Sequence, residues 1–329
     1  MNVAVFDTHG FEREILLAAN GGQHTLHLLD AGLNIRTAEL ARGCEAVVVF
    51  GNDDCSAPVI DALAGLGVRF IATRSAGYNH IDIVRACERG IRVARVPAYS
   101  PYSVAEHAVA LMLALNRKII RAHNRVRELN FSLDGLTGFD MHGKTIGVIG
   151  AGKIGSAVAR IAKGFGCAVL AADPAPDAAL AAETPVRYTD VDSLCRESDI
   201  ITLHAPLLPE TRYLINPQTI ALMKRGVMLI NTSRGGLVDT RAVIAALKTG
   251  HIGYLGLDVY EEEQGLFFHD YSDMILQDDV IARLMTFPNV LITSHQAFLT
   301  DTALHNIAET TIENLTCFAE GRESGNELA

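Results

Sequence analysis

Residues Thr145–Gly155 read TIGVIGAGKIG and decide the fold of the segment around them. A β-branched run typical of a strand leads into Gly150-x-Gly152-x-x-Gly155, and a helical segment, Ser156–Lys163, follows. The first glycine permits a tight turn, the second lets a pyrophosphate approach the backbone, and the third lets the helix pack on the strand. The helix N-terminus offers N–H groups and a positive dipole to phosphates. This stretch therefore predicts a Rossmann dinucleotide-binding site.

The end of the next predicted strand indicates which dinucleotide binds. Ala168–Ala172 is followed by Asp173, about twenty residues after the glycine loop, where an acid is expected to bind the ribose 2′-OH. A carboxylate at this place repels a 2′-phosphate. We therefore predict NAD rather than NADP as the cofactor.

Short apolar runs extend the pattern along the whole chain. They lack strict polar alternation, which is typical of parallel strands covered on both faces. Helical segments such as Arg241–Lys248 lie between them, so the predicted fold class is α/β with two doubly wound parallel sheets. The predicted strands are Asn2–Phe6, Thr25–Leu29, Ala46–Phe50 and Arg69–Thr73, then Thr145–Ile149, Ala168–Ala172, Ile200–His204, Val227–Asn231, Tyr254–Asp258 and Val290–Ser294.

The segments that join or follow the two series leave the topology open. Pro97–Pro101 (PAYSP) predicts a turn, and a helix from about Ser103 bridges the two domains. The apolar stretch Val104–Ile120 is interrupted by charges and too short to span a bilayer, so we predict a buried helix there. The last predicted helix, about Asp301–Ala319, either completes the second domain or returns to the first.

Composition excludes several classes of protein. The 329 residues are 49% hydrophobic and 20% charged, enough for about two domains. The net charge of −10, with no basic cluster, predicts no binding to nucleic acid or anionic membranes. The N-terminal residues MNVAVFDTHG lack a basic region and predict a strand, not a signal peptide. The six cysteines form no CxxC pair, so we expect no metal site and reduced thiols in a cytoplasmic protein.

Three later strand ends carry polar residues whose chemistry is mutually consistent. Arg234 lies in NTSRGG, Glu263 ends DVYEEE, and His295 lies in SHQ. Ligands of open α/β sheets bind outside the carboxyl ends of the strands, so these side chains are expected to converge. A guanidinium grips a carboxylate bidentately, an imidazole exchanges protons near neutral pH, and a carboxylate orients the imidazole. With NADH, this set predicts reduction of a 2-keto acid.

Six stretches together resemble the family of D-isomer-specific 2-hydroxyacid dehydrogenases. They occur in the family's order and cover almost the whole chain. The segment VPAYSPYSVAEHA at Val96–Ala108 and the long insertion Glu261–Leu284 are most similar to the branch that interconverts pyruvate and D-lactate. The six stretches are SAGYNHID at Ser75–Asp82, VIGAGKIG at Val148–Gly155, LHAPL at Leu203–Leu207, NTSRGGLVD at Asn231–Asp239, LDVYEEE at Leu257–Glu263 and TSHQAF at Thr293–Phe298.

The resemblance implies a topology and a role for each matching residue. A flavodoxin-like substrate domain, about 1–98 plus 299–329, would contain an inserted Rossmann NAD-binding domain, about 99–298, with His295 near the cleft between them. Arg234 would bind the substrate carboxylate, His295 would be the acid/base, and Glu263 would pair with it. The backbone of Ser75, Ala76 and Gly77 would also cradle the carboxylate. The implied cofactor residues are Gly150, Gly152, Lys153, Ile154, Gly155, Asp173, His204, Ala205, Pro206, Thr211, Thr232, Ser233, Arg234 and Asp258.

Aromatic residues near these motifs bear on substrate size. Phe50, Tyr99 and Phe298 are candidates for the pocket wall or are core aromatics. As pocket walls they leave room for little more than a methyl, which favours pyruvate. Five further histidines lack supporting motifs, and we interpret them as structural: His80, His107, His142, His251 and His269.

Two alternatives remain open. One is another member of the family, acting on hydroxypyruvate, glyoxylate, 2-ketoisocaproate or phenylpyruvate. The other is a non-catalytic NAD(H)-sensing protein like the family's corepressors. The resemblance also implies a homo-oligomer, a dimer or tetramer, in which Val104–Ile120 is an interface element or simply core.

Overall fold

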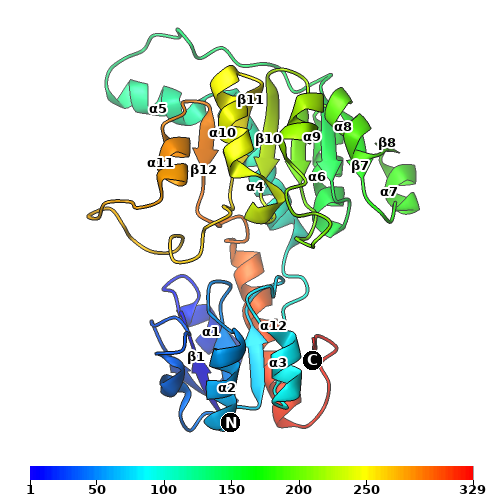
Figure 1. The fold of residues 1–329 in the computed structure, drawn as a ribbon. Helices are drawn as coiled ribbons and strands as arrows, with labels where there is room; N and C mark the ends of the chain where they lie inside the picture. The colour runs from blue at the N-terminus through cyan, green and yellow to red at the C-terminus, as the bar shows by residue number, and fades with distance from the viewer. Residues whose placement is uncertain (329) are drawn as a thin grey trace. The chain divides into compact units, whose positions relative to one another are not determined.

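The computed structural model describes residues 1–328 and divides the chain into two compact units. The first contains Met1–Ser100 and the segment from Leu299 onward, and the second contains Pro101–Phe298. The sequence had placed this division at 98/99. The second unit is therefore inserted into the first, and Figure 1 follows the chain through both.

The first unit is a five-stranded parallel sheet of order β2-β1-β3-β4-β5. This is the order of flavodoxin-like doubly wound sheets. Strands β3 and β4 are buried along their full length, which explains their unbroken apolar sequences. The strands are β1 (Asn2–Val5), β2 (Thr25–Leu28), β3 (Ala46–Val49), β4 (Phe70–Thr73) and β5 (Arg92–Ala94). The helices are α1 (Arg13–Asn20), η1 (Ala38–Ala41), α2 (Ala57–Gly65), α3 (Ile83–Glu88) and α12 (Asp301–Ala319).

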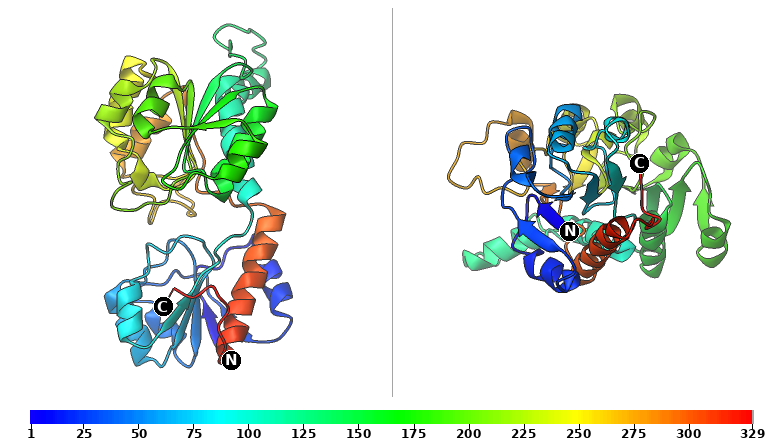
Figure 2. Two further views of the ribbon diagram at one scale, coloured as in Figure 1. Left: turned by 90° about the vertical axis from the view of Figure 1, so that its right-hand side faces the viewer. Right: turned by 90° about the horizontal axis from the view of Figure 1, so that it is seen from below.

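Helix α12 belongs to the first unit and settles which domain the chain returns to. Ala308, Ile312 and Leu315 are buried in one hydrophobic cluster with residues of β1 and β4. Figure 2 shows α12 on one side of this sheet and the α2–α3 side opposite. The bounds of α12 match the predicted helix.

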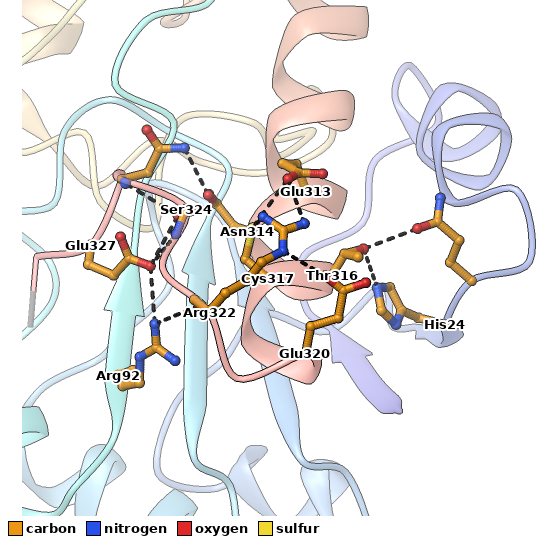
Figure 3. A network of polar contacts seen from close by, with 12 residues as sticks. His24, Arg92, Glu313, Asn314, Thr316, Cys317, Glu320, Arg322, Ser324 and Glu327 are labelled. Carbon is orange, nitrogen blue, oxygen red and sulfur yellow. Dashed lines mark hydrogen bonds and ion pairs between the residues drawn. The ribbon is translucent and has the colours of Figure 1, made fainter.

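The residues after α12 cover the open edge of the same sheet. Glu327 forms an antiparallel bridge with Ala94 of β5, and the Leu328 N–H donates to Val93 O at 2.7 Å. Figure 3 shows Glu327 paired with Arg92, at 3.2 Å, next to the Arg322 ion pairs. Covering an edge strand removes a template for pairing with another chain.

The second unit is a seven-stranded parallel sheet of order β12-β11-β10-β9-β6-β7-β8. One face carries α4 and α6, and the other carries α8, α9 and α10, so both faces are covered. The strands are β6 (Thr145–Ile149), β7 (Ala168–Ala172), β8 (Val186–Tyr188), β9 (Ile200–Leu203), β10 (Val227–Asn231), β11 (Ile252–Leu257) and β12 (Val290–Ile292). The helices are α4 (Pro101–Asn116), α5 (Ile119–Arg127), α6 (Lys153–Gly164), α7 (Ala178–Glu183), α8 (Val191–Glu197), α9 (Pro217–Leu222), η2 (Gly235–Leu237), α10 (Thr240–Thr249) and α11 (Asp279–Met285).

Two predictions about local structure were wrong. Strands β5 and β8 had not been predicted, because three residues are too few to show a periodicity. The buried helix predicted over Val104–Ile120 ends at Asn116, because Lys118 adopts a left-handed φ of 50°. Ile119 and Ile120 are half exposed and belong to α5. Helix α4 packs its buried face on the sheet of its own unit, and its role in an interface stays a prediction.

No helix within residues 1–328 combines the length and apolarity needed to cross a bilayer.

Candidate active site

The glycine loop between β6 and α6 has the geometry that its sequence predicts. Gly150 has a φ of +88°, and a Cβ there would lie 2.6 Å from the backbone of Ala205. A Cβ on Gly155 would lie 1.9 Å from Gly150 O, so only glycine lets α6 approach the strand. At Gly152 a Cβ would meet nothing within 4 Å, which leaves open space beside the loop.

The N-terminus of α6 is free to bind an anion. The first helical residues are Lys153 and Ile154. No side chain among residues 1–328 caps the helix, and its first turn carries no acidic residue. The macrodipole and the uncapped N–H groups therefore favour a phosphate here.

Asp173 lies directly after β7 and is tied to the glycine loop. Its Oδ2 accepts a hydrogen bond from Ala151 N at 2.7 Å, and its Oδ1 accepts one from Ala175 N at 2.8 Å. A carboxylate has about four acceptor positions, so two backbone bonds leave capacity for ribose hydroxyls. The Asp173 carboxylate therefore holds the glycine loop in place. It also lies where a ribose is expected to bind.

The loop after β9 contains a histidine kept neutral by its surroundings. His204 Nε2 lies 2.9 Å from Thr202 Oγ1, while its buried Nδ1 has no hydrogen-bond partner among residues 1–328. Burial lowers the pKa of His204 to about 3. A buried ring nitrogen without a protein partner is suited to a hydrogen bond with a ligand.

The loop after β10 has a second buried polar atom without a hydrogen-bond partner among residues 1–328. Thr232 is buried, and its Oγ1 has no partner in the described part of the chain. Ser233 Oγ donates to Ala205 O at 2.7 Å and so joins the two loops. Thr211 instead stabilises its own turn, donating to Pro206 O at 2.7 Å. The glycine cradle, the uncapped helix and the two unpartnered polar atoms fit a bound dinucleotide.

Arg234 is presented by a loop that the side chain of Asn231 holds. The fully buried Asn231 accepts from Ser233 N at 3.0 Å and donates to Arg234 O at 2.9 Å. The Arg234 guanidinium donates to Ser233 O at 2.7 Å and forms no ion pair within residues 1–328. A half-buried guanidinium without a carboxylate partner is suited to an anionic ligand.

Gly235 brings this loop against the loop that follows β11. A Cβ at this position would lie 2.1 Å from the carbonyl carbon of Tyr260. The loop that holds Arg234 and the loop that leads to Glu263 are therefore in backbone contact.

Glu263 and His295 form the expected pair. Glu263 Oε1 lies 2.8 Å from His295 Nδ1, and Glu263 Oε2 accepts from Tyr260 N at 3.0 Å. Glu261 does not compete for His295, because its carboxylate binds the Tyr213 hydroxyl and Thr240 Oγ1. With Nδ1 paired to Glu263, Nε2 remains for proton exchange with a ligand.

Asp258 shapes the backbone that carries His295. It is fully buried and accepts from Thr293 Oγ1 at 2.5 Å and from the amides of Gln296 and Ala297 at 2.9 Å. Burial alone would raise the pKa of Asp258. The hydrogen bonds, together with His107 Nε2 at 3.4 Å, outweigh burial and lower that pKa. The cofactor contact that the resemblance implies for Asp258 stays a prediction.

The turn around Asp258 forces His295 into an uncommon backbone conformation. His295 N donates to Asp258 O at 2.7 Å, and His295 has a φ of +52°. Non-glycine residues rarely adopt positive φ, and such residues cluster at functional sites.

The other predicted residues lie in the first unit or at the end of the second. Ser75 Oγ donates to Gly77 O at 2.7 Å, and Arg95 donates to Ala76 O at 3.1 Å, so Ser75–Gly77 is an ordered turn. Phe50 is buried, with the Arg74 guanidinium 5.3 Å from its ring centre. The Tyr99 carbonyl accepts a hydrogen bond from Asn306, and Phe298 is buried. The assignment of all these residues as substrate contacts stays a prediction.

Sequence reasoning missed the residues that hold the site together. Asn231, Thr293 and His107 act through tertiary contacts, and His107 had been interpreted only as structural. The one available signal was Asn231, a polar residue ending a wholly apolar strand.

These features define a dinucleotide-binding α/β oxidoreductase with a histidine–carboxylate pair and an unpaired arginine at the strand ends. Comparison with known proteins gives the family. Residues 109–297 match the family model described as "D-isomer specific 2-hydroxyacid dehydrogenase, NAD binding domain". The chain belongs to the D-isomer-specific 2-hydroxyacid dehydrogenase family, and it is an NAD-dependent dehydrogenase.

Individual relatives match over their full lengths. The chain is 51% identical to D-lactate dehydrogenase of Escherichia coli over 329 residues, which is 100% of both chains. The solved apo-structure of Escherichia coli D-lactate dehydrogenase has a TM-score of 0.91 at 49% identity, covering 100% of both chains. A D-lactate dehydrogenase from Aquifex aeolicus, solved with NAD and lactic acid, has a TM-score of 0.89 at 35% identity, covering 99% of both chains.

Proposed function

We propose that this chain catalyses the reversible reduction of pyruvate to D-lactate: pyruvate + NADH + H⁺ ⇌ D-lactate + NAD⁺. The observation that carries the proposal is the His295–Glu263 pair at 2.8 Å, on a loop next to the one that holds the unpaired Arg234. A relative identical at 51% of positions is named D-lactate dehydrogenase, which supports pyruvate as the substrate.

Each of the three side chains has one task. Arg234 binds the carboxylate of the keto acid through two parallel hydrogen bonds. His295 donates a proton from Nε2 to the keto oxygen as charge develops there, and Glu263 stabilises the imidazolium before transfer. In lactate oxidation, the neutral imidazole takes the proton back.

NADH supplies the hydride when bound. We propose that Gly150, Gly152, Lys153, Ile154 and Gly155 cradle its pyrophosphate and that Asp173 binds the adenosine ribose. The unpartnered His204 Nδ1 and Thr232 Oγ1 support contacts from the β9 and β10 loops. The remaining proposed contacts come from the same region: Ala205, Pro206, Thr211, Ser233 and Asp258.

Pyruvate is the proposed substrate on grounds of size as well. Phe50, Tyr99 and Phe298 are bulky, and if they line the pocket they leave space for a methyl group. Ser75, Ala76 and Gly77 are proposed to bind the same carboxylate as Arg234 through backbone N–H groups.

A spectrophotometric assay of NADH oxidation tests the function. The purified chain is offered pyruvate, glyoxylate, hydroxypyruvate, 2-ketoisocaproate and phenylpyruvate, and the product from pyruvate is analysed for chirality. We expect the highest kcat/KM with pyruvate and D-lactate as the product. A higher kcat/KM with another keto acid would reassign the substrate. Tight NADH binding without turnover of any keto acid would favour an NAD(H)-sensing protein.

We also propose that the protein is a homo-oligomer. Helix α5 has no buried residue, and the segment after it exposes three large apolar side chains: Leu129 at 79%, Phe131 at 69% and Leu133 at 81%. Several large apolar side chains exposed within one short segment favour an interface with another chain. Sedimentation analysis should show a dimer or tetramer that Phe131→Asp with Leu133→Asp weakens, and a monomeric wild-type protein would contradict this.

The cysteines support a cytoplasmic location. All six are free thiols and five of them are buried. Reduced cysteines are typical of the cytosol, and fractionation of the source cells would test this.

A further inference from the structure

One short segment contacts the His295 imidazole in two ways. Glu263 binds Nδ1, and the ring of Phe268 lies against the imidazole with centroids 6.0 Å apart and planes inclined by 34°. Five positions separate these two residues in the chain. The same segment therefore provides both a polar and an apolar contact to the proposed acid.

A tight turn connects the two contacts. The backbone amides of Leu266 and Phe267 both donate to Glu263 O at 3.0 Å, and Gly265 has a φ of +74°. Phe267 is buried in a small cluster with Tyr260 and Ile281. The Phe267 side chain thus anchors the turn and leaves the next residue to face His295.

Phe268 itself has a φ of +69°, which bulky side chains rarely adopt. The residue that its ring touches, His295, is also left-handed, at +52°. Strained residues persist where the surrounding structure requires their geometry, and they cluster at functional sites. Phe268 and His295, the proposed proton donor, both have this strained backbone, and their rings are in contact.

We propose that Phe268 is a positioning residue for His295: its ring covers the imidazole and holds it so that Nε2 faces the substrate. This inference rests on the proposed function. Glu263 alone constrains one nitrogen and leaves the imidazole free to rotate about that hydrogen bond. The aromatic contact removes this freedom and keeps water from that side of the ring.

Substitutions at Phe268 test the proposal by kinetics. Phe268→Ala should lower kcat for pyruvate reduction about 10- to 100-fold, because small misplacements of catalytic groups have effects of this size. The dissociation constant for NADH, measured by fluorescence titration, should stay unchanged. Phe268→Tyr keeps the ring and should retain the wild-type kcat within about two-fold.

A glycine substitution separates positioning from mere structural support. Phe268→Gly relieves the left-handed backbone, so its Tm should be at least that of Phe268→Ala while its kcat is equally low. A supporting role alone would instead make kcat follow Tm. Ile275→Ala is the matched control, because Ile275 lies exposed in the same insertion. It should leave kcat and Tm unchanged.

The rate of chemical modification of His295 tests the role of Phe268 without relying on enzyme activity. Diethyl pyrocarbonate modifies accessible imidazoles, and mass spectrometry gives the rate at His295. The rate should rise several-fold in Phe268→Ala and stay at the wild-type value in Phe268→Tyr and Ile275→Ala. Equal modification rates in all variants, or wild-type kcat in Phe268→Ala, would overturn the proposal. An inactive wild type with a faster-modified Phe268→Ala would overturn the proposed function alone.

Discussion

Glu263 presents one carboxylate oxygen to His295 Nδ1 at 2.8 Å while its other oxygen accepts from Tyr260 N at 3.0 Å. The carboxylate is therefore fixed by its own loop before it orients the imidazole. Replacing Glu263 with Gln should keep the shape and lose the charge. We expect kcat/KM for pyruvate to fall about 100-fold or more, the size of a general acid–base contribution.

A neighbouring glutamate provides the control for Glu263→Gln. Glu262→Gln removes a negative charge from an exposed residue of the same loop and should retain the wild-type kcat/KM for pyruvate. Steady-state kinetics of both variants measure this. A wild-type kcat/KM in Glu263→Gln would contradict the pairing.

Arg234 is expected to bind substrate through geometry as well as charge. Arg234→Lys keeps a positive charge but not the planar pair of donors. We expect KM for pyruvate to rise at least ten-fold and kcat to fall in Arg234→Lys, with larger losses in Arg234→Ala. Steady-state kinetics at saturating NADH measure both. Arg196→Ala, which removes an exposed arginine, should behave as wild type, and near-normal kinetics in Arg234→Ala would disprove the assignment.

Asp173 should control cofactor choice. Asp173→Ala removes a charge that repels a 2′-phosphate, and it also frees Ala151 N, which the carboxylate binds at 2.7 Å. We expect KM for NADH to rise and the ratio of kcat/KM for NADH over NADPH to fall by about ten-fold or more. Asp177→Ala, at the N-cap of α7, serves as the control. A ratio that stays constant in Asp173→Ala would place the ribose elsewhere.

Asp53 should make the protein less stable as pH rises. It is buried and accepts from the amides of Phe50 and Leu33. Burial raises the pKa of Asp53 to about 7 in the folded state, above the value of about 4 in an unfolded chain. Between these pH values the folded state binds more protons, so this residue's contribution to the free energy of unfolding declines from about pH 4 to pH 7.

Asp53→Asn tests the sign of this effect. The amide does not titrate, so the free energy of unfolding should depend less steeply on pH between 5 and 7. Urea unfolding at several pH values measures this. Asp30→Asn, on the surface of the same unit, should keep the wild-type slope. A steeper slope in Asp53→Asn would contradict the assignment.

The sequence predicted the sheets better than the small contacts that complete them. Ten of the strands left a clear apolar run because both faces of each sheet are covered, whereas β5 and β8 are three residues long and depend on pairing. The end of α4 was mispredicted because the left-handed φ of Lys118 has no sequence signal.

The sequence likewise predicted some residues of the candidate site and not others. Polar residues at strand ends pointed to Arg234, Glu263 and His295 because parallel strands bring their carboxyl ends to one edge. The residues that hold them, such as Asn231 and Thr293, act through contacts that the chain path alone determines. The positive φ of Phe268 is likewise a product of tertiary structure.

Gly235 tests whether the contact between the two loops matters to catalysis. A Cβ on Gly235 would lie 2.1 Å from the carbonyl carbon of Tyr260 and 2.2 Å from its oxygen, so Gly235→Ala must push the loops apart. The shift separates Arg234 from Glu263 without changing either side chain. We expect kcat/KM for pyruvate to fall about 10- to 100-fold, because displacement by about 1 Å costs this much.

The stability change and a matched glycine complete the Gly235 test. Overpacking should lower the free energy of unfolding by about 1–3 kcal/mol. Gly164→Ala introduces the same methyl at the end of α6, where a Cβ meets nothing within 4 Å. That variant should keep wild-type kinetics and gain about 0.4–1 kcal/mol, because alanine restricts the unfolded chain. Wild-type kcat/KM in Gly235→Ala would mean that the loops tolerate separation and that Arg234 and the His295–Glu263 pair act independently.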